Sequence, residues 1–279
     1  MTSEAKAFAP ANISCIFKIY YHKNPRWMGS YGIGFTINEG VISKVSESGT
    51  MQILFNNKKI NFPTVKSVIK KLTNEKLKVE IITKLPLGCG FGLSGASALA
   101  TAYAINKLCK LGKTNKELAI IAHTAEVENK TGLGDVVNQY YGGFCIKLKP
   151  SSYFIVRKVS ISNVNIHCRY FSRLSTKSIL ANPKLKNRIN KAASTALKKI
   201  IILLKSKKIL KLDDVIRISK GFSAESGLLR DKKTLQTIFN IEKNRGNSSM
   251  IMLGNAVFSD QPFADSIKFK ISNKAACII

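Results

Sequence analysis

Three acidic side chains lie close together in a chain that has few acids. Glu126, Glu128 and Asp135 fall within a span of ten residues, in a chain of 279 residues with 16 Asp and Glu in all. Mg²⁺ prefers oxygen ligands and needs only one or two from the protein when phosphate and water supply the rest. Glu126 and the hydroxyl of Ser94 form the candidate metal pair. Asp135 is the candidate catalytic residue, because a carboxylate can accept the proton of a substrate hydroxyl.

Each of these acids also has a plainer interpretation. Glu126 and Glu128 are typical of a solvated helix end, and Asp135, which follows Gly132 and Gly134, is typical of a helix N-cap. For an isolated residue we would favour these structural roles. Their occurrence just after a phosphate-type loop favours the chemical roles instead.

That loop is the glycine-rich stretch from Pro86 to Ala96. Glycine lets the backbone approach an anion closely, and the free amides at a helix start suit phosphates. The stretch has neither the Gly-Lys-Ser/Thr of a P-loop nor an early dinucleotide fingerprint, and a purely structural tight turn is the alternative. The predicted cofactor-binding residues are Pro86, Gly88, Gly90, Phe91, Gly92, Leu93, Ser94, Gly95 and Ala96.

The elements around the loop place these groups at element ends. Alternating residues predict a strand over 77–82 before the loop, and an alanine-rich helix over 98–108 follows it. A capping box at 114–117 begins a helix that carries Glu126 near its end. Asp135 heads a short helix that ends at Gly142, so the loop and the carboxylates all lie where one element passes to the next.

The remaining chain predicts a mixed architecture with one boundary. Pro150 to Ser152 is the expected domain boundary, which separates residues 1–150 from residues 151–279. The expected strands are 7–20, 35–37, 41–45, 51–55, 144–148, 153–159, 164–171 and 266–271; the expected helices are one beginning at Pro63, then 184–211, 213–226 and 233–244; and a second glycine- and serine-containing stretch is 246–250.

The net charge of +29 suggests nucleic acid, but its distribution argues against that partner. Lysines are scattered along the whole chain. The densest block, 184–211, has the spacing of an amphipathic helix with a solvated basic face, and it has no aromatic residues for stacking on bases. A general lysine bias explains the charge more simply, and we expect no specific nucleic-acid partner.

The sequence also bears on membrane binding, disulfide bonds and metal sites. The aliphatic run 200–204 is too short to span a bilayer, so we expect a cytoplasmic protein with no membrane partner. The six cysteines are widely separated, which is typical of reduced core thiols and disfavours zinc and disulfides. His22, His123 and His167 are too scattered to form a metal site, and His123 is predicted to be structural.

These residues carry a resemblance to a known family. The stretch from Pro86 to Ala96 resembles the glycine- and serine-rich motif of the GHMP kinases, with support from segments 10–17, 29–34 and 250–255. Within that superfamily the stretch 122–136, which contains Ala-Glu-Val-Glu-Asn and Thr-Gly-Leu-Gly-Asp, is most similar to the archaeal pantoate kinases.

The resemblance implies an α+β fold of two domains, an N-terminal ATP-binding domain over 1–150 and a C-terminal domain over 151–279. It implies ATP and Mg²⁺ as cofactors, and phosphoryl transfer to the primary hydroxyl of pantoate in coenzyme A biosynthesis. The loop amides would hold the triphosphate, with Ser94 and Glu126 at the metal and Asp135 at the hydroxyl. Shikimate, homoserine and mevalonate are alternative acceptors, a basic nucleic-acid-binding protein is the alternative class, and a homodimer is left open.

An acidic substrate suits a basic pocket. From charge type alone, Lys23 and Arg26 are candidates to meet its carboxylate, and Ser30 is assigned to the substrate with them. Three departures from the family pattern concern Leu93, which replaces the first of two serines, Asn12, which stands where some members carry a lysine, and the glycine-poor stretch 248–254.

Overall fold

The computed structural model describes residues 4–206 and 209–279. Lys207 and Lys208, which belong to the predicted amphipathic helix, lie outside the described residues. Within the described ranges, no helix combines the length and the apolar composition that crossing a membrane requires.

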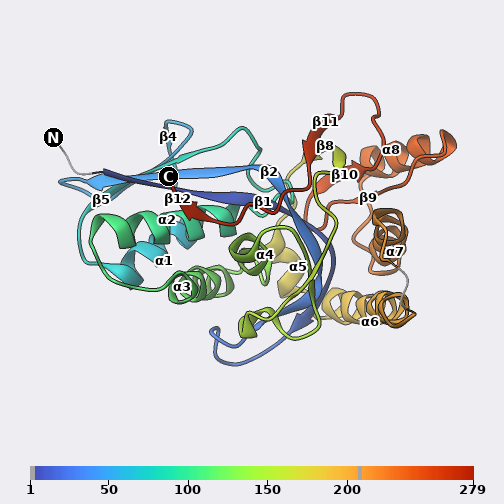
Figure 1. Ribbon diagram of the computed structural model, residues 1–279, viewed down its shortest axis with the longest axis horizontal. Coiled ribbons are helices and arrows are strands. Elements are labelled where there is room, and N and C mark those ends of the chain that lie inside the picture. Colours follow the sequence, from blue (N-terminus) through green and yellow to red (C-terminus); the bar gives the residue numbers. More distant parts are fainter. Residues whose placement is uncertain (1–3, 207–208) are drawn as a thin grey trace.

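A long antiparallel hairpin runs through the molecule (Figure 1). It consists of β1 (Glu4–Tyr20) and β2 (Gly29–Glu47), paired from Glu4 opposite Ser46 to Tyr20 opposite Gly29. The sequence predicted two separate strands within β2, but the structure has one. Gly40, which separates the two predicted strands, lies opposite Pro10 of β1. A side chain at this position would overlap the backbone of β1, and glycine, which has none, lets the two strands stay paired.

The hairpin is the centre of an eight-stranded sheet, in which β12, β1, β2, β5, β3 and β4 follow one another and β6 and β7 extend from β2. Among the strands of the described residues, β3 and β5 alone pair in parallel. The remaining strands of this sheet are β3 (Gln52–Phe55), β4 (Lys58–Lys59), β5 (Leu77–Ile82), β6 (Phe144–Lys147), β7 (Arg157–Val159) and β12 (Cys277–Ile278).

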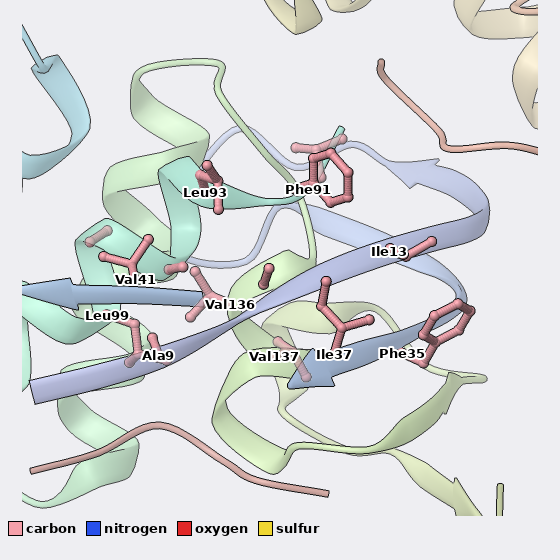
Figure 2. Close-up of a cluster of buried hydrophobic side chains, with 14 of the residues drawn as sticks. Ala9, Ile13, Phe35, Ile37, Val41, Phe91, Leu93, Leu99, Val136 and Val137 are labelled. Atoms are coloured by element: carbon pink, nitrogen blue, oxygen red, sulfur yellow. The ribbon is translucent and has the colours of Figure 1, made fainter. Parts of the chain in front are cut away.

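Helices α1 (Pro63–Leu72), α2 (Leu93–Leu108) and α3 (Asn115–Glu128) cover one face of this sheet (Figure 1). Small alanines let α2 lie between the sheet and the other two helices, buried on almost every side. Figure 2 shows Leu93 and Leu99 of α2 in one apolar cluster with Ala9 and Val41 of the hairpin. The predicted capping box of α3 is confirmed, since Thr114 and Glu117 bond reciprocally.

The second sheet is antiparallel and has the order β11, β8, β10, β9. Helices α7 and α8 pack against β9, and α6 packs against α7 and β1. Its strands are β8 (Asn165–Ser172), β9 (Ser248–Met250), β10 (Asn255–Ser259) and β11 (Ile267–Lys270), and the helices after α3 are α4 (Asp135–Tyr141), α5 (Thr176–Ala181), α6 (Pro183–Lys205), α7 (Leu212–Glu225) and α8 (Lys232–Lys243).

The structure also differs from the sequence expectation outside the long hairpin. The predicted strand 153–159 is a short 3-10 turn over Ser151–Tyr153 followed by β7, because Phe154 has a φ of 53° and turns its ring into the core. The hairpin of β9 and β10 was not predicted, since its first strand begins with polar residues that are nonetheless buried. Strand β12 was also not predicted. Because β7 and β12 join the large sheet from beyond residue 150, the domain division at that residue stays a prediction.

His123 of α3 lies fully inside the protein. Its Nε2 lies 2.9 Å from the carbonyl oxygen of Met28, and its ring packs edge-on against Phe154. Burial lowers the pKa of His123 to about 4, because the charged imidazolium loses its hydration there. The native protein therefore holds this imidazole neutral at pH values where an unfolded chain would protonate it.

We expect the stability of the protein to depend on pH through His123. The unfolded chain binds a proton here near pH 6.5 and the native chain near pH 4, so stability present above pH 6.5 is lost as the pH falls through this window. Between pH 7 and pH 5 the loss is about 2 kcal/mol. Urea unfolding of the parent and of His123→Gln at both pH values measures it. If the unfolding free energy fell equally in the parent and in His123→Gln between pH 7 and pH 5, His123 would not be the group responsible.

Candidate active site

The glycine-rich loop joins β5 to α2 and carries no side-chain cap for the helix that follows it. Gly88, Gly90 and Gly92 have φ angles of 84°, 90° and 63°, in the left-handed region that glycine adopts without strain. Gly92 is the N-cap of α2, whose first amides have no side-chain partner. Free amides at a helix start are the groups that bind phosphate.

Two segments from the second half of the chain pack against this loop. A side chain at Gly254 would overlap the backbone of Cys89, so the stretch after β9 lies directly on the loop. The amide of Leu174 donates a hydrogen bond of 3.1 Å to the carbonyl of Gly88. The glycine-poor stretch 248–254 therefore still supports the loop, through the one glycine that it retains.

A cavity of about 340 Å³ opens beside the loop, and we call it the donor cavity. It is bordered by the loop, the start of α1, the end of α3 and the segment after β8. Its lining residues are Asn61, Phe62, Pro63, Leu87, Gly88, Gly90, Phe91, Gly92, Leu93, Ser94, Glu126, Asn129, Lys130, Thr131, Asp135, Leu174, Ser175, Thr176, Lys177, Met252 and Leu253.

Glu126 is 1% exposed and lies in a space that two glycines keep open. A Cβ at Gly95 would come within 2.8 Å of its Oε2, and one at Gly132 within 2.5 Å. Thr131 donates to Oε1 at 3.4 Å, whereas Oε2 has no partner among the described residues. Burial and the nearby Asp135 raise the pKa of Glu126 to about 8, although the hydroxyls of Ser94 and Thr131 act to lower it. A buried carboxylate oxygen without a partner fits a metal ligand.

Asp135 is the first residue of α4 and is held at one oxygen only. Its Oδ1 accepts from Asn12 Nδ2 at 2.6 Å and from Ser14 Oγ at 3.0 Å. Among the described residues Oδ2 accepts no hydrogen bond. Burial raises the pKa of Asp135, while the charge of Lys147 and the two hydrogen bonds oppose that rise. The carboxylate is thus oriented, has one free oxygen, and is more basic than an exposed aspartate.

Lys147, at the end of β6, completes this polar group and was not predicted as a site residue. It is 3% exposed, and its Nζ donates to Asn138 Oδ1 at 2.8 Å and to the carbonyl of Gly134 at 3.3 Å. Asn138 in turn donates to Asn12 Oδ1 at 2.8 Å. The sequence held one signal for this role: Lys147 follows three apolar residues in a strand that is otherwise typical of the core.

A second, much smaller pocket of about 30 Å³ also borders Asp135, and we call it the acceptor pocket. Asp135, Thr176, Met252 and Leu253 line both spaces. Asp135 therefore lies at the boundary between the two spaces. The residues of the acceptor pocket are Ser14, Ile16, Phe17, Ser30, Leu133, Gly134, Asp135, Lys147, Thr176, Leu180, Met252 and Leu253.

The structure brings most of the predicted donor-side residues together. Ser94, Glu126 and Asp135 all line the donor cavity, together with Gly88 and Gly90 to Leu93 of the loop. Gly95 lies beneath Glu126, and Pro86 and Ala96 do not line the cavity. Ser30 lines the acceptor pocket.

The other predicted residues lie elsewhere. Lys23 is exposed, and Arg26 donates to the carbonyl of Ser152 at 3.1 Å and stacks on Trp27, so neither lines the two spaces. Their role at the substrate stays a prediction. Glu128 pairs with Lys71 at 2.8 Å on the surface, as the solvated helix end predicts.

The sequence was compared with family profiles and with known proteins, and the matches identify the family to which the chain belongs. The family profile described as GHMP kinases N terminal domain matches residues 63–143. A pantoate kinase from Methanocaldococcus jannaschii is 33% identical over 90% of this chain and 90% of its own length. The chain belongs to the GHMP kinases.

Two further similarities cover this GHMP kinase almost completely. A pantoate kinase from Methanospirillum hungatei is 30% identical, over 91% of this chain and 86% of its own. A solved structure titled as a phosphotransferase related to the coenzyme A biosynthesis pathway has a TM-score of 0.81 and 26% identity, and the match covers 99% of this chain and 98% of the other. The α+β fold of the family is thereby confirmed.

Replacing Gly132 by alanine tests whether Glu126 depends on the space beside it. The added Cβ would displace the buried carboxylate, and we expect a loss of about 1–3 kcal/mol of unfolding free energy. Gly221→Ala in α7 is the matched control, because its Cβ would meet open space. That control should gain about 0.5–1 kcal/mol, the usual preference for alanine within a helix. Urea titration measures both, and equal stability of Gly132→Ala and the parent would contradict the packing argument.

Proposed function

We propose that this chain phosphorylates the primary hydroxyl of pantoate with ATP, giving 4-phosphopantoate in coenzyme A biosynthesis. One observation carries the proposal: the donor cavity and the acceptor pocket meet at Asp135, and the acceptor pocket contains a buried lysine. The similarity to pantoate kinases over nine-tenths of the chain supports it. We further propose that residues 1–150 form the ATP-binding domain and residues 151–279 the second domain, and that the enzyme acts in the cytoplasm.

The donor cavity fits ATP with magnesium. The loop amides from Gly88 to Gly95 would hold the triphosphate, and Ser94 with the free oxygen of Glu126 would hold the metal ion. ATP supplies the transferred phosphoryl group, and magnesium neutralises part of its charge. A hydroxyl chain from Ser94 to Thr64 at 3.2 Å, and from Thr64 to Thr131 at 3.0 Å, orients these ligands.

Asp135 orients the acceptor and receives its proton. Because Asn12 and Ser14 both bond to Oδ1, the free Oδ2 can accept a hydrogen bond from the substrate hydroxyl. A raised pKa makes the carboxylate a better proton acceptor during the transfer. The hydroxyl oxygen is thereby held at the boundary between the two spaces.

Lys147 is the candidate partner of the pantoate carboxylate. It is a cation that lines the acceptor pocket, while Ile16, Phe17 and Leu180 give the same pocket apolar walls. An apolar wall suits the gem-dimethyl group of pantoate, and a buried ammonium forms a strong charge-assisted hydrogen bond to a carboxylate. Homoserine carries an additional ammonium group that Lys147 would repel, whereas shikimate and mevalonate carry a carboxylate as pantoate does.

The reaction is tested by coupled ADP release with ATP and Mg²⁺ against pantoate, shikimate, homoserine and mevalonate. We expect turnover with pantoate. In Asp135→Asn, kcat should fall by about 10²–10⁴, the usual contribution of a general base, while the KM for ATP changes by less than about twofold. Circular dichroism checks that the variant folds. A raised KM for ATP with kcat unchanged would contradict the assigned role of Asp135.

A second kinetic test separates Lys147 from the cations predicted by charge type. In Lys147→Met the KM for pantoate should rise about tenfold to a hundredfold, since a charge-assisted hydrogen bond is lost. Lys147→Arg should retain most of the affinity. The double variant Lys23→Ala with Arg26→Ala is the comparison. If it raises the KM instead and Lys147→Met does not, the carboxylate binds at the early loop.

A further inference from the structure

The donor cavity has few cations for a ligand as negative as a triphosphate. The stretch from Pro86 to Ala96 contains no Lys or Arg, and Glu126 and Asp135 add negative charge. Asn12 stands where some family members carry a lysine. The cations that line the donor cavity are Lys130 and Lys177.

Lys177 lines the donor cavity next in sequence to a residue that borders both spaces. It follows Thr176, which lines both the donor cavity and the acceptor pocket, as Asp135 does. A transferable phosphoryl group has to reach this shared boundary. We therefore expect the ammonium of Lys177 to reach the terminal phosphate of a bound nucleotide rather than the inner phosphates.

Its segment is tied to the phosphate loop. Leu174 bonds to the carbonyl of Gly88, and a Cβ at Gly88 would lie 3.2 Å from the side chain of Arg173. The turn into α5 is fixed by Ser175, whose Oγ accepts from the amide of Ser178 at 3.3 Å. The backbone before Lys177 is thus held against the nucleotide site.

The side chain of Lys177 itself is free to bind a ligand. It is exposed, and within residues 4–206 and 209–279 its ammonium forms no ion pair or hydrogen bond. Lys130 differs in position. It follows α3 and also borders a separate pocket with Tyr21 and Met28. Its neighbours Asn129 and Thr131 line the donor cavity and not the acceptor pocket, whereas Thr176, the neighbour of Lys177, lines both.

We propose that Lys177 is a catalytic residue that contacts the γ-phosphoryl group of ATP, a role that rests on the proposed kinase function. In the transfer, a bond forms from the acceptor oxygen to the γ-phosphorus, the bond to the β,γ-bridging oxygen breaks, ADP leaves, and the hydroxyl proton passes to Asp135. Lys177 remains protonated throughout. Its ammonium binds a non-bridging γ-oxygen and stabilises the charge of the group while it moves.

The test compares nucleotides that differ only at the γ-position. Dissociation constants are measured by calorimetry, without pantoate, for ADP and for an ATP analogue with a methylene bridge between the β- and γ-phosphates. In Lys177→Met the analogue should bind about tenfold more weakly and ADP within about twofold of the parent. Lys177→Arg keeps the positive charge and should bind the analogue almost as tightly as the parent does. Lys184→Met, an exposed α6 position that lines neither space, removes the same charge and should change neither constant.

Turnover provides the second readout. We expect kcat of Lys177→Met to fall about tenfold or more with the KM for pantoate unchanged. Equal weakening of both nucleotides would place Lys177 at the inner phosphates and overturn the proposal, as would no change in either. Because binding is measured without an acceptor, a preserved analogue-specific loss together with no pantoate turnover would reject the proposed substrate and not the role of Lys177.

Discussion

Two carboxylates that are kept out of water beside a phosphate-type loop are the constraint around which the structure is organised. Burial disfavours the charge on Glu126 and Asp135, and each raises the cost of ionising the other. The protein offsets this cost with groups of known position: amide and hydroxyl donors on Asp135, threonine hydroxyls near Glu126, and the ammonium of Lys147. A bound metal ion would lower the cost of ionising these two carboxylates further, because it would add positive charge beside them.

The long hairpin is what brings these groups to one point. The register of β1 shifts between Pro10 and Asn12 and again between Ser14 and Ile16, so two irregularities flank the residues that hold Asp135. Irregular register re-aims side chains, and such features concentrate beside active sites. The same hairpin supports α2 on one side and α6 on the other, which places the phosphate loop and the second half of the chain against a common strand.

Much of this arrangement could be predicted from the sequence, because the signals for it lie within short segments of the chain. The glycine-rich loop, the capped helix with Glu126 and the helix headed by Asp135 follow from turn chemistry and periodicity within short windows. What could not be predicted depends on contacts between distant segments. Lys147 joins the site only because Asn138 and Gly134 bind its ammonium and Asp135 lies near it. The buried Ser248 and Ser249 of β9 have no periodic signal. Lys23 and Arg26 were chosen by charge type alone, and they do not line the two spaces, so their role at the substrate stays a prediction.

Strand β12 has a consequence for how the protein is made. Its residues Cys277 and Ile278 pair with Phe8 and Ala7 of β1, across nearly the whole chain, and Ser272 bonds to Thr36 of β2. During synthesis the hairpin emerges before β12, so the β1 edge that β12 covers stays unpaired until residues 277 and 278 have been translated. Such long-range pairing is slow and leaves strand edges open meanwhile. The sheet that carries the glycine-rich loop is therefore completed only after the strands of the second sheet have been synthesised, which couples the folding of the two halves in time.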